Sequence, residues 1–366
     1  MRVRNYMNLT DLGNEPNSDF SCILFFMSKL NFRNQINFYY MKKISGIMQW
    51  HMVKQLCLSM AVILFAVTTT RAGGHYPQLP DGASIEGRWD ITIDIAGREF
   101  PSWLEVTHSG THTLVGQFVG IGGSARPISR VNFTNGKLSF SIPPQWEQGD
   151  GDVVVEGELN GDKLSGTIVF SDGKKYEWAA VRAPSLRRNS QPAWGTPVRL
   201  FNGKDLSGWH ATGNNQWVAV SGILRSPKSG ANLVTDKTFN DFKLHIEFRY
   251  PKESNSGVYL RGRYEVQITD SKGMDPSKDQ LGAVYGFLPP TEMMAKDAGQ
   301  WQSYDVTLVG RMVTVALNGK TVICNREIPG ITGGAIDSKE GEPGPLLIQG
   351  DHGPIEYRNI IITPAK

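Results

Sequence analysis

Cysteines, long apolar runs and helical periodicity are all scarce in this sequence of 366 residues. Its three cysteines are too few for a disulfide-dense scaffold. The longest apolar run, at 56–67, is shorter than the roughly 20 residues that a membrane-spanning helix needs. After residue 84, no stretch of ten or more residues repeats its apolar positions every 3.6 residues, so a coiled coil is excluded.

The net charge is also small. The chain carries 38 basic and 35 acidic residues, a formal charge of +3. Eight of the basic residues but only three of the acidic ones lie in residues 1–72, so the remainder holds 30 basic and 32 acidic side chains. A nearly neutral body gives no basis for binding nucleic acid or an anionic membrane surface. We therefore expect no nucleic-acid partner.

Residues 52–72 have the three parts of a secretory signal peptide. Lys54 supplies the positive charge, residues 56–67 form the apolar core, and small residues lead to a cleavage point after Ala72. Cleavage there predicts a periplasmic or extracellular protein whose mature chain has no membrane span. Residues 1–51 have no clear pattern, and we interpret them as an over-long, unstructured start.

Turn signals between short alternating segments predict an all-β protein. A proline-bearing linker at 183–197 separates a small domain at 84–182 from a larger one at 198–364. The small domain has the strand spacing of a β-barrel or β-sandwich, and its Gly87-Arg88-Trp89 resembles the start of lipocalin-like barrels. The hairpin signals are Asn-Gly or Asp-Gly pairs at 135–136, 160–161, 172–173 and 318–319.

Three predicted strands of the second domain, at 243–250, 258–261 and 264–269, separate apolar from polar side chains by strict alternation. A solvated sheet face shows the same alternation. However, carboxylate, guanidinium, amide and phenol groups together form a hydrogen-bonding set that suits sugar hydroxyls. The candidates on this polar face are Glu247, Tyr259, Arg261, Glu265 and Gln267.

Two glycine-containing loops add further candidates. Tyr285 lies in the loop 281–286, where its ring could stack on a ligand or form a hydrogen bond with it. Gln349 and His352 lie in the loop 349–353, where the flanking glycines predict that the imidazole is outside the core.

Several ordered motifs resemble the 3-keto-disaccharide hydrolase domain, a family long catalogued as a domain of unknown function. The resemblance covers about 198–364 and leaves the first domain outside. It implies a concanavalin-like jelly-roll sandwich whose concave sheet binds sugar. The motifs are 200–209, 254–261, 264–268, 282–286, and 344–349 continued by 357–360.

The resemblance implies a secreted enzyme that cleaves glycosides already oxidised at C3 of one sugar. The ketone acidifies the hydrogen at C2, so that a base can remove it, an acid can assist the leaving group at C1, and water can add to the enone. Glu265 and His352 are the expected acid and base, with Arg261 facing the enolate oxygen. This route requires no cofactor, while a metal requirement and the oligomeric state stay open. The expected substrate-binding residues are Glu247, Tyr259, Gln267, Tyr285 and Gln349.

Two alternatives use the same residues. Glu247 and Glu265 could form the carboxylate pair of an ordinary glycosidase, whose separation a sequence does not contain. The same face could also bind carbohydrate without turnover, as a lectin does.

Overall fold

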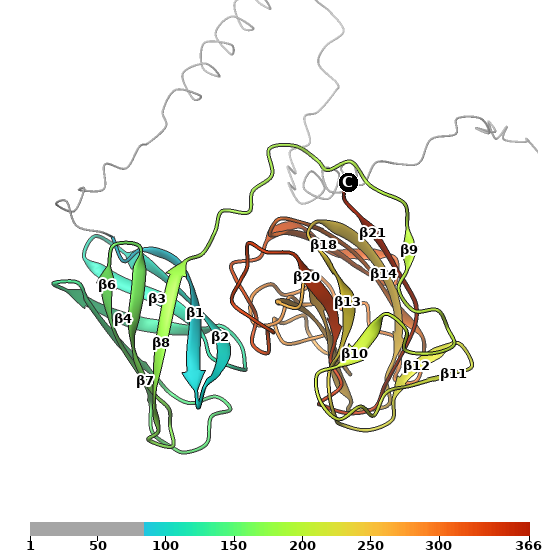
Figure 1. Cartoon of the computed structure of the whole chain (residues 1–366), viewed down its shortest axis with the longest axis horizontal. Coiled ribbons are helices and arrows are strands. Elements are labelled where there is room, and N and C mark those ends of the chain that lie inside the picture. Colours follow the sequence, from blue (N-terminus) through green and yellow to red (C-terminus); the bar gives the residue numbers. More distant parts are fainter. Residues whose placement is uncertain (1–83) are drawn as a thin grey trace, which may run out of the picture. The chain divides into compact units, whose positions relative to one another are not determined.

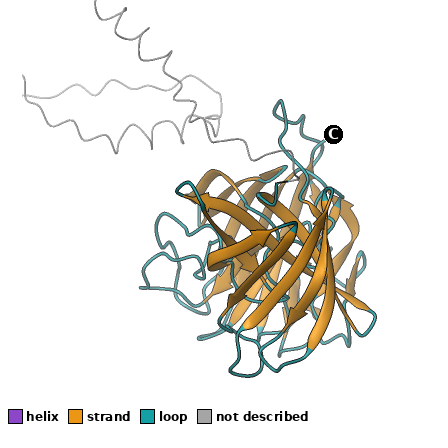
Figure 2. Cartoon of the chain, turned by 90° about the vertical axis from the view of Figure 1, so that its left-hand side faces the viewer, coloured by secondary structure: helices purple, strands orange, loops and turns teal. Residues whose placement is uncertain are grey.

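The computed structural model describes residues 84–366, and all regular secondary structure in this range is β-strand (Figure 2). This confirms the predicted all-β class. The predicted signal peptide at 52–72 and the predicted over-long start at 1–51 lie outside the described residues. Nowhere in residues 84–366 is there a helix with the length and apolar character to cross a membrane.

The first eight strands form a closed barrel in which each strand pairs with the next and β8 closes on β1 (Figure 1). Of the two predicted forms of this part, the structure is therefore the barrel. The strands are β1 (Gly87–Ile95), β2 (Arg98–Ser109), β3 (Thr113–Val119), β4 (Arg126–Thr134), β5 (Lys137–Ile142), β6 (Val153–Asn160), β7 (Lys163–Val169) and β8 (Lys175–Arg182).

The barrel encloses its own apolar core, which includes Trp89 of the Gly87-Arg88-Trp89 motif. Trp89 is fully buried, its indole N–H donates to Ile85 O at 2.9 Å, and the Arg182 guanidinium lies 3.8 Å from its ring centre. The hairpin signal Asn135-Gly136 joins β4 to β5 with positive φ at both residues, as a tight hairpin turn requires.

The second half is a sandwich of two antiparallel sheets. The five-stranded sheet has the order β10-β13-β20-β15-β16. Its strands are β10 (Trp209–Ala211), β13 (Leu233–Phe239), β15 (Asn255–Leu260), β16 (Tyr264–Thr269) and β20 (Gly344–Ile348).

The other sheet follows the order β11-β12-β21-β14-β17-β18-β19, and the short β9 pairs with β21. The inner faces of both sheets share one apolar core. This arrangement is the predicted jelly-roll sandwich. The strands are β9 (Val198–Arg199), β11 (Val218–Val220), β12 (Ile223–Ser226), β14 (Phe242–Arg249), β17 (Gln302–Val309), β18 (Met312–Leu317), β19 (Lys320–Glu327) and β21 (Ile355–Pro364).

Barrel and sandwich belong to one compact unit, Leu79–Lys366. Trp103 of β2 is fully buried in the sandwich's core cluster, and its ring meets Phe287 edge-on at 5.2 Å. Arg88 of β1 also pairs with Glu327 of β19 at 2.7 Å. The two parts therefore share buried apolar surface. The division into separate domains at 183–197 stays a prediction.

Candidate functional site

The outer face of the five-stranded sheet and its rim bring together six of the eight predicted site residues. Strand alternation turns Val258 and Leu260 of β15 into the core, and therefore turns Gly257 and Tyr259 outward. In β16 it turns Glu265 and Gln267 outward. The register places Tyr259 opposite Glu265 and Gly257 opposite Gln267.

The Glu265 carboxyl is the chemical centre of this face. Its residue is only 3% exposed, and the Tyr259 hydroxyl donates to its Oε2 at 2.9 Å. Burial raises the pKa of Glu265 to about 8, although the Tyr259 hydrogen bond and the positive charge of His352 act in the opposite direction. The carboxyl is therefore protonated at neutral pH and available as a proton donor.

Two glycines make room for this pair. A side chain at Gly257 would overlap with Glu265 Oε1. At Gly334, whose φ is +80°, an added Cβ would lie 2.6 Å from the Tyr259 hydroxyl oxygen. Both positions must therefore be glycine for Tyr259 and Glu265 to keep their arrangement.

His352 follows β20 and lies at the exposed rim of the same face. Its Nδ1 is 2.6 Å from Asp351 Oδ1, and this hydrogen bond raises the pKa of the imidazole, helped by the Glu265 carboxylate. A carboxylate on Nδ1 fixes that nitrogen as the donor and leaves Nε2 as a proton acceptor in the neutral ring. His352 and Glu265 are thus near enough for the charge of each to shift the pKa of the other.

Two more predicted residues are joined to this face by main-chain hydrogen bonds. The Tyr285 N–H donates to Glu265 O at 3.0 Å, and burial raises the pKa of its phenol. The Gln349 N–H donates to Gly257 O at 2.9 Å, beside Gln267. The side-chain oxygen of Gln349 is buried and has no hydrogen-bond partner among residues 84–366, so it is an acceptor that these residues leave unsatisfied.

The structure corrects the prediction for Arg261. The alternation argument assumed that β15 continues to residue 261, but the strand ends at Leu260 and Arg261 begins a turn with φ of +53°. Its guanidinium is fully buried and donates to Tyr264 Oη at 2.8 Å and Gly310 O at 3.2 Å. These partners lie on the core side of β16, so Arg261 does not stand beside the Glu265 carboxyl.

Glu247 was also placed wrongly, because its strand β14 belongs to the other sheet. Its carboxylate accepts from Arg358 at 2.6 Å and from Asn359 at 2.8 Å. Since the two sheets of a sandwich are about 10 Å apart, outward side chains on opposite sheets are separated by more than that. Glu247 and Glu265 therefore cannot act as a carboxylate pair on one sugar.

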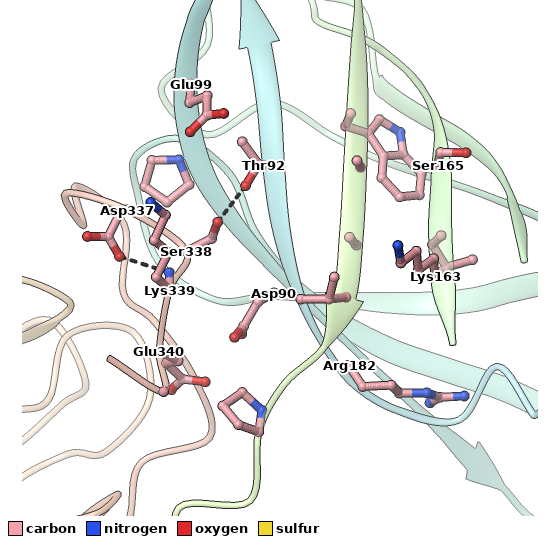
Figure 3. A pocket seen from close by; sticks show the side chains of 18 of the residues that line it. Asp90, Thr92, Glu99, Lys163, Ser165, Arg182, Asp337, Ser338, Lys339 and Glu340 are labelled. Carbon is pink, nitrogen blue, oxygen red and sulfur yellow. Dashed lines mark hydrogen bonds between the residues drawn. The ribbon is translucent and has the colours of Figure 1, made fainter. Parts of the chain in front are cut away.

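A cavity of about 1130 Å³ lies between the outer side of β1, β7 and β8 and the segment 336–342 (Figure 3). It contains none of the predicted site residues. Asp90 lines it, and burial together with the neighbouring Glu340 carboxylate raises the pKa of Asp90 to about 8. Tyr264 and Arg311 both donate hydrogen bonds to Glu340. Because Arg261 donates to Tyr264, it belongs to this buried polar cluster around Glu340.

Sequence reasoning missed two residues of the Glu265 face and left a metal requirement open. Asp351 was passed over, although its place next to His352 in the chain was a signal for a hydrogen-bonded pair. Trp146 of the barrel was not considered, although its indole lies beside the Tyr285 phenol. Within the described residues, no group of three or more His, Cys, Asp or Glu side chains could hold a metal ion.

Comparison with known proteins relates the sandwich to carbohydrate-active proteins. Residues 196–363 match the model of the 3-keto-alpha-glucoside-1,2-lyase-like domain. A curated 3-keto-disaccharide hydrolase from Bacteroides thetaiotaomicron is 22% identical over 34% of this chain and 57% of its own, so the match spans little more than half of that relative.

Two solved structures are also similar. A candidate glycosyl hydrolase from Parabacteroides distasonis is 27% identical, with a TM-score of 0.40 over 50% of this chain and 96% of its own. A β-glucanase from Bacillus licheniformis is 12% identical, with a TM-score of 0.31 over 49% of this chain and 100% of its own. The sandwich at residues 196–363 is thus the part of the chain that matches the 3-keto-alpha-glucoside-1,2-lyase-like domain.

Proposed function

We propose that this protein cleaves 3-keto glycosides, with Glu265 as the general acid and His352 as the general base. The observation that carries the proposal is the buried Glu265 carboxyl, which has a pKa of about 8 and lies within the electrostatic reach of a His–Asp pair. Two titratable groups with different environments on one sheet face are the usual arrangement for proton transfer in both directions. The family of the sandwich and the name of the curated relative support the 3-keto substrate class.

In the first half of the reaction, His352 Nε2 removes the proton from C2, which the neighbouring ketone acidifies. The electron pair of the C2–H bond forms the enolate and then the C1–C2 double bond, and the C1–O bond breaks. Glu265 gives its proton to the departing oxygen. Asp351 accepts the Nδ1–H bond and stabilises the imidazolium that forms.

Hydration of the enone restores both groups. Water adds its hydroxyl to C1 while the Glu265 carboxylate accepts the remaining proton, and the imidazolium returns a proton to C2. The amide groups of Gln267 and Gln349 and the phenol of Tyr285 are the groups placed to hold the ketone oxygen and the sugar hydroxyls. They take the role that Arg261, buried in another cluster, does not fill.

The test is incubation of the purified protein with a 3-keto glucoside and, as the matched control, the same glucoside without the ketone. We expect transient enone absorbance and released aglycone from the 3-keto compound alone. In D₂O, elimination and hydration place deuterium at C2 of the product beyond the level of an enzyme-free sample, whereas direct hydrolysis adds none.

Two results would contradict the proposal. Equal cleavage of the unoxidised glucoside would indicate ordinary hydrolysis. Saturable binding of both compounds with no product from either would favour the lectin-like alternative.

A further inference from the structure

The barrel has a loop that reaches the Glu265 face. Trp146 lies between β5 and β6 and is 71% exposed, which is high for the largest apolar side chain. Its indole lies beside the phenol of Tyr285, whose pKa it lowers while burial raises it. The Tyr285 N–H in turn donates to the main-chain carbonyl of Glu265, so contacts run from the barrel loop to strand β16 beside the carboxyl.

The position of Trp146 is held by its neighbours. Glu147 accepts hydrogen bonds from the backbone N–H of Gln145 at 2.7 Å and of Trp146 at 3.1 Å, and it pairs with the nearly buried Arg126 at 2.6 Å. The Arg126 guanidinium also donates to Pro143 O at 2.9 Å. An exposed indole on a loop tied down in this way has little conformational freedom left to lose when a ligand binds.

A second barrel loop, 120–125, lies against the same site. The Gly334 N–H donates to Ile121 O at 3.0 Å, and Gly334 is the glycine that stands against the Tyr259 hydroxyl. The Lys278 ammonium donates to Ala125 O at 3.2 Å, and Gly286, next to Tyr285, leaves room for no side chain against Ala125. The barrel therefore forms one wall of the Glu265 face.

We propose that the barrel supplies a second binding subsite, in which Trp146 and Tyr285 hold the unit of the glycoside beyond the sugar that reacts. This inference rests on the proposed function and concerns which leaving groups the proposed reaction accepts. The chemistry required of that unit is a flat ring with an apolar face, because an exposed indole offers a π-surface for stacking and the Tyr285 phenol offers a hydrogen bond. A second sugar ring and an aromatic aglycone both have this chemistry.

Kinetics with three substrates test the subsite: a 3-keto disaccharide of two glucose units, a 4-nitrophenyl 3-keto-glucoside and methyl 3-keto-glucoside. We expect Trp146→Ala to lower the ratio of kcat/KM for the disaccharide to that for the methyl glycoside by at least about tenfold, mainly through KM. A loss confined to the nitrophenyl compound would assign the subsite to aromatic aglycones. The control, Trp301→Ala, removes an aromatic residue that stacks with Arg358 on the other sheet, and should leave the ratio unchanged.

A binding measurement separates the failure of this inference from failure of the proposed function. Titration of the disaccharide should change the tryptophan fluorescence of the Glu265→Gln protein, and adding Trp146→Ala should remove that change. This readout needs no turnover, so it applies even if no 3-keto glycoside is cleaved. An unchanged substrate ratio together with an unchanged fluorescence response in Trp146→Ala would overturn the subsite.

Discussion

Tyr259 stands directly opposite Glu265 in the register of β15 and β16, and its hydroxyl lies 2.9 Å from Oε2 and 3.0 Å from Gly333 O. The hydroxyl has a single proton for these two acceptors. When Glu265 is ionised, Tyr259 donates to it. When Glu265 is protonated, the carboxyl donates to Tyr259, and Tyr259 then donates to Gly333 O. The hydrogen bond between Tyr259 and Glu265 is therefore present in both protonation states of the carboxyl.

Removing the transferable proton of Glu265 should slow turnover strongly without unfolding the protein. We expect Glu265→Gln to lower kcat for a 3-keto glucoside by roughly 10²–10⁴-fold, the usual contribution of a general acid. The matched control is Glu247→Gln, which changes the same functional group on the opposite sheet and should keep wild-type kcat. Wild-type turnover in Glu265→Gln would leave His352 as the better candidate for the essential group.

The pH dependence of kcat/KM should be bell-shaped. Activity is lost above about pH 8, because the pKa of Glu265 is raised to about 8 and the acid must be protonated. It is lost at low pH as His352 becomes protonated. Asp351→Asn should move both limbs to lower pH, because Asp351 raises the pKa of both groups. A profile still rising between pH 8 and 9 would rule out Glu265 as the acid.

Gly257→Ala should damage the site by crowding alone. The added methyl group overlaps with Glu265 Oε1, so either the carboxyl moves or the fold loses about 1–3 kcal/mol of stability. We expect a large loss of kcat, measured beside the free energy of unfolding. Gly213→Ala is the control, since a Cβ there makes only an ordinary contact with Ala231 at 3.6 Å. Full activity in Gly257→Ala would contradict the packing described for Glu265.

Asp90 should make the protein less stable as the pH rises. Its folded-state pKa of about 8 lies above its ordinary value of 3.8, so the stability present below pH 4 is lost progressively up to about pH 8. Asp90→Asn should reduce this decline when unfolding by urea is compared at pH 5 and pH 8.5. Asp94→Asn, an exposed change on the same strand, should not. An identical pH dependence in wild type and Asp90→Asn would mean that Asp90 is ionised in the folded protein at both pH values.

We also propose that the protein is exported after cleavage near Ala72, as the pattern of residues 52–72 predicts. The mature protein should begin near Gly73, which N-terminal sequencing of exported material can check. Recovery of exported protein with residues 1–51 still attached would contradict this proposal.

Local patterns in the sequence were enough to predict the hairpins, the all-β class and the shared face of Tyr259, Glu265 and Gln267. A period of two is a property of each strand alone, so it correctly separated core from outward side chains within β15 and β16. The same reasoning failed at Arg261, because a turn with positive φ interrupts the alternation after Leu260.

Long-range pairing settled the rest. Alternation within a strand does not show to which sheet the strand belongs. The sequence therefore predicted β14 on the same face as β15, whereas β14 pairs with β17 and β21 in the other sheet. That pairing places Glu247 outside the site. The pKa of Glu265 depends on burial by segments distant in the chain, and no local pattern records that. Trp146 meets Tyr285 across 139 positions of sequence, a contact that exists only because the barrel and the sandwich share buried surface.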